Sequence, residues 1–411
     1  MGYIKQTVKG VSWLGALRVI IRGLTFVRLA MLARILTPGE FGLFGIATLV
    51  LAFLEIITET GINVFFIQDE GKLKDYADTA WIVSIFRGII ISFSIVLFAP
   101  LISKFFNSPD SIKLLYFIAV IPLLRGFINP SIIKFQKEFE FNKEFFLRAG
   151  IFLIDSLVAV GLAFYLKTAI SLVWGMVVGV LVEVIISQLF IKPRPRFSFT
   201  SLKFKKVLNR GKWVTASSIL QYLFTNTDSM VIGKLLSSNS LGFYQMAYKI
   251  STLPITEISN VFYNVTFPVF SKFQNDKKRL KKAFLKSTLV IVLIAVPVGL
   301  AIYLFAKEIV VFILGKEWIP VVAPLKILSI YGILRAITAE FPAVFMALKK
   351  QELVTKVTLV AVLGIGITII PFVRKFGILG ASYSALFGMI LAIPLMTYYM
   401  YILLWRKNGK H

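Results

Sequence analysis

The chain has 411 residues, of which 57% are hydrophobic and only 16% are charged. A water-soluble domain of this length needs a far more polar surface, so these values exclude a soluble protein. The formal net charge of +26 would indicate nucleic-acid binding in a soluble protein, but in so apolar a chain it is typical of cytoplasmic membrane-protein loops. We therefore expect a membrane protein with no nucleic-acid partner.

Two residue types that carry much of enzyme chemistry are missing or nearly so. The chain has no cysteine, and its single histidine is His411, the last residue of the sequence. Disulfides, thiolate catalysis and metal sites built on cysteine or histidine are therefore excluded. We expect no metal site and no cofactor.

Apolar runs of about 20 residues, the length that spans a bilayer as a helix, occur twelve times along the chain. The bilayer offers no water to backbone groups, so each run must be helical. The fold class predicted is an all-α, polytopic membrane protein with twelve transmembrane helices. The predicted spans are 11–36, 41–66, 79–105, 112–133, 145–166, 169–191, 213–236, 241–270, 283–306, 322–348, 357–373 and 379–405.

The distribution of lysine and arginine sets the orientation of these spans. An even number of spans places both termini on one side, and the segments on that side hold most of the basic residues. The segments 192–212 and 272–282 are especially rich in them. By the positive-inside rule, both termini are predicted to be cytoplasmic, in the plasma (inner) membrane of a prokaryote.

The two halves of the chain repeat each other at an offset of about 200 residues. The run ARILTPGEFGLFGIA, which ends at Ala47, aligns with GKLLSSNSLGFYQMA, which ends at Ala247. A repeat with an even number of spans predicts two six-helix bundles related by a pseudo-two-fold axis along the membrane normal. The predicted domains are residues 1–191, a basic cytoplasmic linker at 192–212, and residues 213–411. The linker is either a solvated loop or a contact for anionic lipids.

Several motifs resemble one known family. They are RLAMLARILTPGEFGLFGIA in the first half, and DSMVIGKLLSSNSLGFYQMAYKI, FPVFSKFQNDKKRLKKAF and LGKEWIPVVAPLKILSIYGILRAI in the second. They resemble the Wzx-type polysaccharide and O-antigen flippases of the multidrug/oligosaccharidyl-lipid/polysaccharide superfamily. The resemblance covers essentially the whole chain.

This resemblance implies that the protein flips undecaprenyl-pyrophosphate-linked oligosaccharide from the cytoplasmic to the outer leaflet by alternating access, for lipopolysaccharide or exopolysaccharide biosynthesis. The implied partners are that lipid, membrane lipids, a polysaccharide polymerase and glycosyltransferases. A cation-coupled multidrug exporter of the same fold is the main alternative. A lipid II flippase is a weaker one, because those proteins have two further spans. A polymerase or ligase is disfavoured because the longest predicted outer segment, 307–321, offers few catalytic groups.

Charged residues inside the spans are candidate functional residues, because a charge is costly within the bilayer. Arginines collect in the first half, and guanidinium groups suit a pyrophosphate because they present a permanently charged fork of donors. The candidate substrate-cavity residues are Arg18, Arg22, Arg28, Arg87, Arg125 and Arg148.

Carboxylates in the spans are candidates for ion coupling, with Na⁺ or H⁺ as the coupling ion, or for pairing with arginines. They are Glu55, Glu59, Asp155, Asp228 and Glu257. Estimated depths at about 1.5 Å per residue match Arg22 with Glu55 and Arg18 with Glu59. These pairs are either structural salt bridges or part of a polar cavity wall.

Four prolines lie inside predicted spans, where each removes a backbone hydrogen bond and bends the helix. Such bends serve either as hinges for alternating access or in packing. The four prolines are Pro122, Pro254, Pro297 and Pro342.

Overall fold

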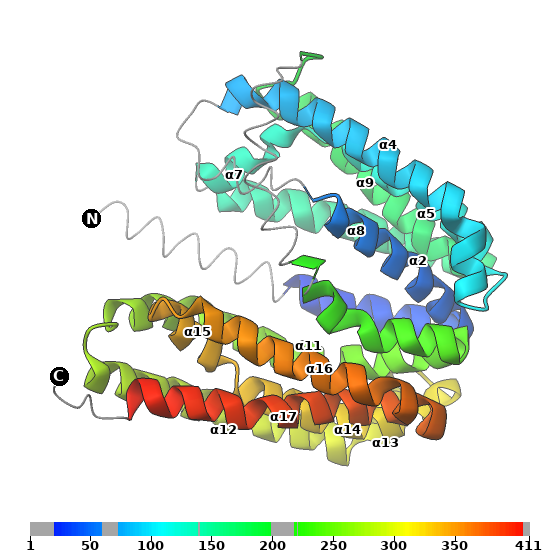
Figure 1. The fold of residues 1–411 in the computed structure, drawn as a ribbon. Coiled ribbons are helices and arrows are strands. Elements are labelled where there is room, and N and C mark those ends of the chain that lie inside the picture. Colours follow the sequence, from blue (N-terminus) through cyan, green and yellow to red (C-terminus); the bar gives the residue numbers. More distant parts are fainter. Residues whose placement is uncertain (1–19, 60–72, 139, 199–217, 220, 406–411) are drawn as a thin grey trace. The chain divides into compact units, whose positions relative to one another are not determined.

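The computed structural model describes residues 20–59, 73–138, 140–198, 218–219 and 221–405. These residues form helices and connecting turns, with no β-strand among them (Figure 1). The described residues fall into two compact units. The first comprises the described residues within Met1–Asn226 and Ser237–Asn239, and the second comprises those within Thr227–Leu236 and Ser240–His411.

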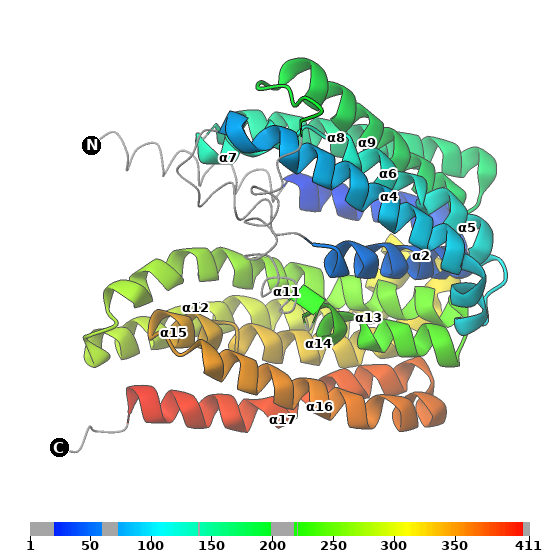
Figure 2. The same ribbon diagram turned by 45° about the horizontal axis from the view of Figure 1, so that its top comes forward.

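The first unit begins with a helix at residues 20–35, and α8 and α9 pack along each other within it (Figure 2). Its core lies where α2, α4, α5 and α9 meet, and it contains Ala47, Ile95, Leu115 and Val173. The labelled elements of this unit are α2 (Pro38–Ile57), α4 (Leu73–Phe105), α5 (Ser111–Ile118), α6 (Val120–Gly126), η1 (Pro130–Ile133), α7 (Lys134–Lys137), α8 (Phe141–Leu166) and α9 (Ile170–Phe190).

A helix at residues 221–235 leads into the second unit. In this unit α16 and α17 pack along each other, as do α12 and α14, and one apolar cluster contains Ile255, Ile291 and Ala336. The elements are α11 (Ser238–Lys272), α12 (Lys277–Leu304), α13 (Ala306–Ile313), η2 (Lys316–Val321), α14 (Val322–Ile337), α15 (Glu340–Ala347), α16 (Gln351–Phe376) and α17 (Ile378–Leu404).

Many helices are long and apolar enough to cross a membrane. Eight qualify among the described residues, or nine if the pair Ser111–Gly126 and Pro130–Lys137, bent by 71°, forms one span. Helices occupy at least part of each of the twelve predicted ranges, but the twelve-span count itself stays a prediction. Large apolar side chains such as Leu157, Leu293 and Ile367 are exposed on these helices, as expected for surfaces that contact lipid. The chain is a multi-pass membrane protein.

Two of the predicted spans are interrupted. The range 112–133 is divided between α5, α6 and η1, and the range 322–348 between α14 and α15. In each, a proline is the third residue after the break, Pro122 in α6 and Pro342 in α15. A proline has no N–H to donate to the carbonyl four residues earlier, so the preceding turn loses a hydrogen bond. Pro254 and Pro297, in contrast, lie inside the continuous helices α11 and α12.

The helix boundaries reproduce the sequence repeat. The helix at 20–35 is followed by a two-residue break before α2 begins at Pro38, and the helix at 221–235 is followed by a two-residue break before α11 begins at Ser238. In the first copy, the Thr37 side chain caps α2 by accepting a hydrogen bond from the backbone N–H of Glu40, as N-terminal caps do. The common offset of 200 residues supports a duplication.

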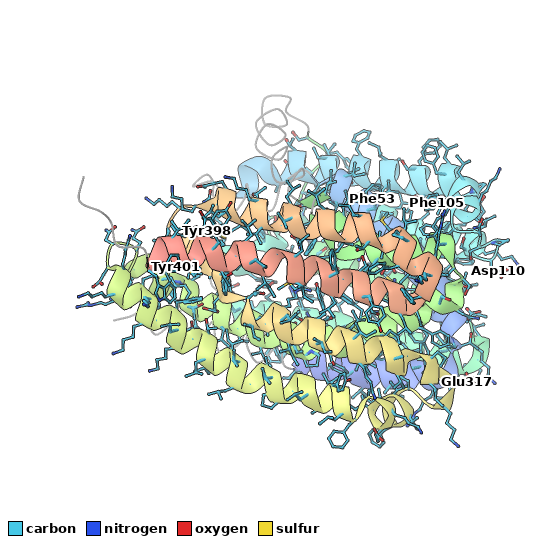
Figure 3. The ribbon with its side chains drawn as sticks, turned by 60° about the horizontal axis from the view of Figure 1, so that its bottom comes forward. Phe53, Phe105, Asp110, Glu317, Tyr398 and Tyr401 are labelled. Atoms are coloured by element: carbon cyan, nitrogen blue, oxygen red, sulfur yellow. The ribbon has the colours of Figure 1, made fainter. Side chains whose placement is uncertain are left out.

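The second unit carries aromatic and basic side chains at one end. Figure 3 shows Tyr398 and Tyr401 near the C-terminal end of α17, and Glu317 at the opposite end of this unit. The ammonium group of Lys281 lies 4.3 Å from the ring centre of Trp405. Tyrosine, tryptophan and lysine are enriched where a helix leaves the hydrocarbon region, so these residues mark a membrane interface.

Candidate functional site

A pocket of about 220 Å³ lies in the first unit between α2, α4 and α6. Its lining combines two arginines and a glutamate with small and apolar groups: Glu55, Ser84, Arg87, Gly88, Ile91, Pro122, Arg125 and Gly126. It therefore brings together Arg87 and Arg125, two of the predicted cavity arginines, and Glu55, one of the predicted carboxylates.

Two glycines let α4 and α6 approach closely beside this pocket. A Cβ atom at Gly88 would lie 2.3 Å from the carbonyl oxygen of Pro122, and one at Gly126 would lie 2.9 Å from the Cα of Ile85. No side chain fits at either contact. The arginines that precede these glycines, Arg87 and Arg125, therefore sit next to the tightest part of the helix crossing.

Glu55 and Arg125 form an ion pair in this pocket. Arg125 Nη1 lies 2.5 Å from Glu55 Oε1, and the two side chains are 39% and 26% exposed. The sequence depth estimate matched Glu55 with Arg22 in the neighbouring span, whereas the structure pairs Glu55 with Arg125 from α6. Depth along straight helices carries no information about which helix faces which, and therefore could not identify Arg125.

Arg87 is bound differently, because it donates to neutral oxygens. Its Nη2 donates to the backbone carbonyl of Glu55 at 2.6 Å, and its Nε donates to the Thr58 hydroxyl at 3.1 Å. Both acceptors lie at the C-terminal end of α2, where backbone carbonyls lack helical partners and carry partial negative charge. The carboxylates of Glu55 and Glu59 are both near enough to act on Arg87 electrostatically. The residues lining the pocket carry two guanidinium charges and one carboxylate charge.

A second predicted arginine, Arg28, forms a bidentate ion pair with Asp155 of α8. Arg28 Nη1 and Nη2 lie 2.7 and 3.1 Å from the two carboxylate oxygens, and the side chains are only 15% and 18% exposed. Gly175 of α9 makes room for this pair, because a Cβ atom there would lie 2.6 Å from Asp155 Oδ1. Arg28 therefore joins the helix at residues 20–35 to α8.

Arg148 and Arg22 are not among the residues that line the pocket. Arg148 binds Glu144 on α8 at 2.7 Å and is 53% exposed. Arg22 is exposed and takes part in interactions of its own. Arg18 lies outside the described residues. Glu183, on α9, interacts electrostatically with Arg148 and Arg125.

The second unit contains a buried polar cluster that sequence reasoning found only in part. Asp228 accepts a hydrogen bond of 2.5 Å from the Tyr244 hydroxyl, and Arg335 Nη1 donates to the Tyr248 hydroxyl at 3.1 Å. The rings of Tyr248 and Tyr331 lie 6.4 Å apart. The i, i+4 spacing of Tyr244 and Tyr248 places both on one face of α11. This spacing was the signal that could have found them.

Glu257, the last predicted carboxylate, lies on α11 and is half-buried. Groups of three or more histidine, cysteine, aspartate or glutamate side chains that could hold a metal ion are absent from the described part of the chain. The pocket in the first unit is lined by two arginines and one glutamate, and forked guanidinium donors suit an anion.

The chain is similar to known proteins of polysaccharide biosynthesis. The model of a family described as "Polysaccharide biosynthesis protein" matches residues 31–323. The chain is 26% identical over 355 residues to the lipopolysaccharide biosynthesis protein WzxC of Escherichia coli K12, covering 86% of this chain and 72% of that one. It is 24% identical over 326 residues to the succinoglycan biosynthesis transport protein ExoT of Rhizobium meliloti, covering 76% of this chain and 64% of that one.

The fold is similar to that of a solved transporter. The structure of the lipid II flippase MurJ in an inward closed conformation matches with a TM-score of 0.76 at 15% sequence identity, covering 94% of this chain and 86% of that one. At this identity the match concerns the fold alone.

Proposed function

Because the chain belongs to the family of polysaccharide biosynthesis proteins, we propose that it carries a lipid-linked oligosaccharide from the cytoplasmic to the outer leaflet for surface polysaccharide biosynthesis. The resemblance of its motifs to Wzx-type flippases is confirmed by the family match and by WzxC. The chain is a polysaccharide transporter and not an enzyme, in keeping with relatives that are named for polysaccharide biosynthesis and transport.

The architecture we propose has twelve transmembrane helices in two six-helix bundles, residues 1–191 and 213–411, joined by the basic segment 192–212. The matched helix boundaries before Pro38 and Ser238 support it. So does the repeated break before α6 and α15. In this architecture a pseudo-two-fold axis along the membrane normal relates the two bundles.

The single observation that carries the substrate assignment is the environment of Arg87. Its guanidinium group faces a pocket that also contains Arg125, and neither of its two hydrogen bonds is made to a carboxylate. A pyrophosphate is a compact anion with several acceptor oxygens, which forked guanidinium donors bind well. We propose that Arg87 and Arg125 contact the pyrophosphate and that Glu55 is the exchangeable partner that holds Arg125 until the substrate arrives.

The other predicted residues take supporting roles in this proposal. The bidentate pair of Arg28 with Asp155 holds two helices of the first unit in register. Arg148, which is half-exposed, attracts the anion before it enters, and Arg22 extends the same positive region. Coupling to Na⁺ or H⁺ would use a carboxylate. Glu55, Glu59, Asp155, Asp228 and Glu257 remain the candidates.

A multidrug exporter that moves cations is the alternative. A cation site needs a net negative or aromatic lining, whereas this pocket contains two arginines for one glutamate. The pocket therefore favours an anionic substrate. The family match favours a polysaccharide precursor over lipid II.

The cellular setting follows from the same proposal. We place the protein in the inner membrane of a prokaryote with both termini in the cytoplasm, where glycosyltransferases assemble the substrate. A polysaccharide polymerase receives it on the other side. The positive-inside distribution of lysine and arginine supports this orientation.

The test uses the purified chain in liposomes that contain a polyprenyl-pyrophosphate-linked oligosaccharide with a fluorescent sugar. Flipping is measured as the fraction of label that becomes accessible to a membrane-impermeant quencher. We expect flipping by the wild-type protein, and none when the same oligosaccharide is attached to a neutral lipid. Transport of a cationic dye without flipping of the lipid would instead support the exporter.

A further inference from the structure

A buried carboxyl group in the second unit belongs to none of the interactions described so far. Glu340 is the first residue of α15, directly after the break that ends α14. It is 0% exposed, and it lies inside an apolar segment that is long enough to cross a membrane. A charged residue in such a place is costly and is a candidate for function.

The groups that bind Glu340 are hydroxyls. Ser287 of α12 lies 3.1 Å from Glu340 Oε2, and the Thr266 hydroxyl of α11 also hydrogen-bonds the carboxyl group. The second oxygen, Oε1, is buried and has no hydrogen-bond partner among the described residues. The rings of Phe284 and Phe341 meet beside it at 5.4 Å.

Charged groups on the neighbouring helices face elsewhere. Lys286 of α12 and Glu352 and Lys356 of α16 are exposed. The Tyr263 hydroxyl of α11 reaches α15 at the sulfur of Met346, 3.4 Å away. In the described part of the second unit, Glu340 forms no ion pair with a lysine or arginine.

Counting hydrogens indicates the protonation state of this group. The Ser287 hydroxyl has one hydrogen, and two acceptors lie within reach, the carbonyl of Phe284 at 3.0 Å and Glu340 Oε2 at 3.1 Å. Thr266 is placed similarly, with the carbonyl of Phe262 at 2.9 Å. Both hydroxyls make the bond to their own helix that serine and threonine commonly make. A protonated Glu340 can then donate its own hydrogen to one of these two hydroxyl oxygens, while Oε1 stays without a partner among the described residues.

An ionised Glu340 would fit this site poorly. A carboxylate has about four acceptor positions, and two shared hydroxyl hydrogens cannot fill them. An unpaired carboxylate in an apolar interior is strongly disfavoured relative to its neutral form. A sodium ion would need several more oxygen ligands than this carboxyl group and two hydroxyls supply.

We infer that Glu340 is a proton-binding site whose charge state is linked to the packing of α15 against α11 and α12. With the proton bound, the carboxyl group is neutral and α15 packs as the structure shows. When the O–H bond breaks, the proton passes to water and the carboxylate needs water around it. Release therefore requires α15 to move away from Ser287 and Thr266. The use of this switch in transport rests on the proposed function, whereas the protonation of Glu340 does not.

The first experiment measures protonation directly. Infrared difference spectra of the purified full-length protein in lipid nanodiscs, recorded as a function of pH, report the carbonyl stretch of neutral carboxyl groups. We expect a component that persists well above pH 4.3, the ordinary pKa of glutamic acid. This component should be missing in Glu340→Gln and present in Glu308→Gln, whose glutamate is exposed at the other end of the unit. Its persistence in Glu340→Gln, or its absence from wild type, would overturn the inference.

A second measurement needs no variant. A hydrophobic carbodiimide reacts with protonated carboxyl groups in apolar surroundings, and mass spectrometry locates the modified residue. We expect modification at Glu340 that slows as the pH rises and is unaffected by Na⁺ at constant pH. Protection by Na⁺ would identify a sodium site and overturn the proton assignment, as would a lack of modification. Neither measurement involves the oligosaccharide, so failure here is distinguishable from failure of the proposed function.

Discussion

Arg87 donates to the backbone carbonyl of Glu55, at 2.6 Å, while the carboxylate of Glu55 binds Arg125. One glutamate thus holds two arginines through two different groups. Replacing the Glu55 side chain removes only one of these contacts, since the carbonyl remains with any residue at this position. The two arginines can therefore be tested separately.

Arg87→Gln should weaken binding of inorganic pyrophosphate to the purified protein by about 10- to 100-fold. This corresponds to about 1.5–3 kcal/mol, the value of a hydrogen bond to a charged group. Arg87→Lys should retain part of the affinity, because it keeps the charge and loses the fork. Isothermal titration calorimetry measures both. Arg374→Gln, an exposed arginine at the end of α16, is the control and should bind as wild type does. Equal affinities in all four proteins would remove Arg87 from the site.

Glu55→Gln should strengthen pyrophosphate binding several-fold, because it frees Arg125 and makes the pocket more positive. Both members of the pair are more than a quarter exposed, so the loss of stability should be no more than about 1 kcal/mol. Flipping should nevertheless slow, since a substrate held more tightly leaves more slowly. The double change Glu55→Gln with Arg125→Gln should lose the gain in affinity. If the double variant keeps the gain, Arg125 is not the residue that Glu55 restrains.

Asp155→Asn should destabilise the protein by about 3 kcal/mol, because it leaves Arg28 largely buried without its partner. The double change Arg28→Gln with Asp155→Asn should recover much of that stability, since neither residue is then an unpaired charge. Thermal unfolding in detergent measures both. Pyrophosphate affinity should be unchanged in the double variant if the pair only joins helices. A loss of affinity equal to that of Arg87→Gln would place Arg28 in the binding site.

Gly88→Ala should destabilise the first unit by about 1–3 kcal/mol, because the added methyl group would lie 2.3 Å from the Pro122 carbonyl oxygen and force α4 and α6 apart. Gly150→Ala, on α8, is the matched control, because no atom lies within 4 Å of a Cβ atom there. Alanine has the higher helix propensity, so the control should be neutral or stabilised by up to about 1 kcal/mol. Equal melting temperatures for the two variants would contradict the close crossing.

The predicted orientation is testable with single cysteines, since the natural sequence contains none. A membrane-impermeant maleimide added to intact cells should label Lys316→Cys. It should label Lys192→Cys and Lys282→Cys only after the cells are permeabilised. The opposite pattern would reverse the topology and place the pyrophosphate pocket toward the wrong leaflet.

The sequence predicted which segments are helices better than it predicted which side chains pair between them. Apolar length alone located the spans, because a bilayer imposes helix on any such run. Apolar length could not show the breaks near Ala119 and Thr338, because the sequence stays apolar through both. Only the prolines that follow, Pro122 and Pro342, indicated a bend there. Depth along a span also leaves helix rotation undetermined. For that reason Glu55 was matched with Arg22, and the Tyr244 partner of Asp228 was missed.

The 200-residue offset that aligns α2 with α11 also makes Arg28 and Asp228 equivalent positions in the two copies of the repeat. Arg28 binds a carboxylate, whereas Asp228 binds a phenol. After a duplication, each copy is free to diverge while the two-residue break that follows its helix is retained. Here the two copies carry opposite charges at equivalent positions, and each charged side chain binds a partner within its own unit. A duplicated fold can in this way keep its backbone while its two copies acquire different polar interiors.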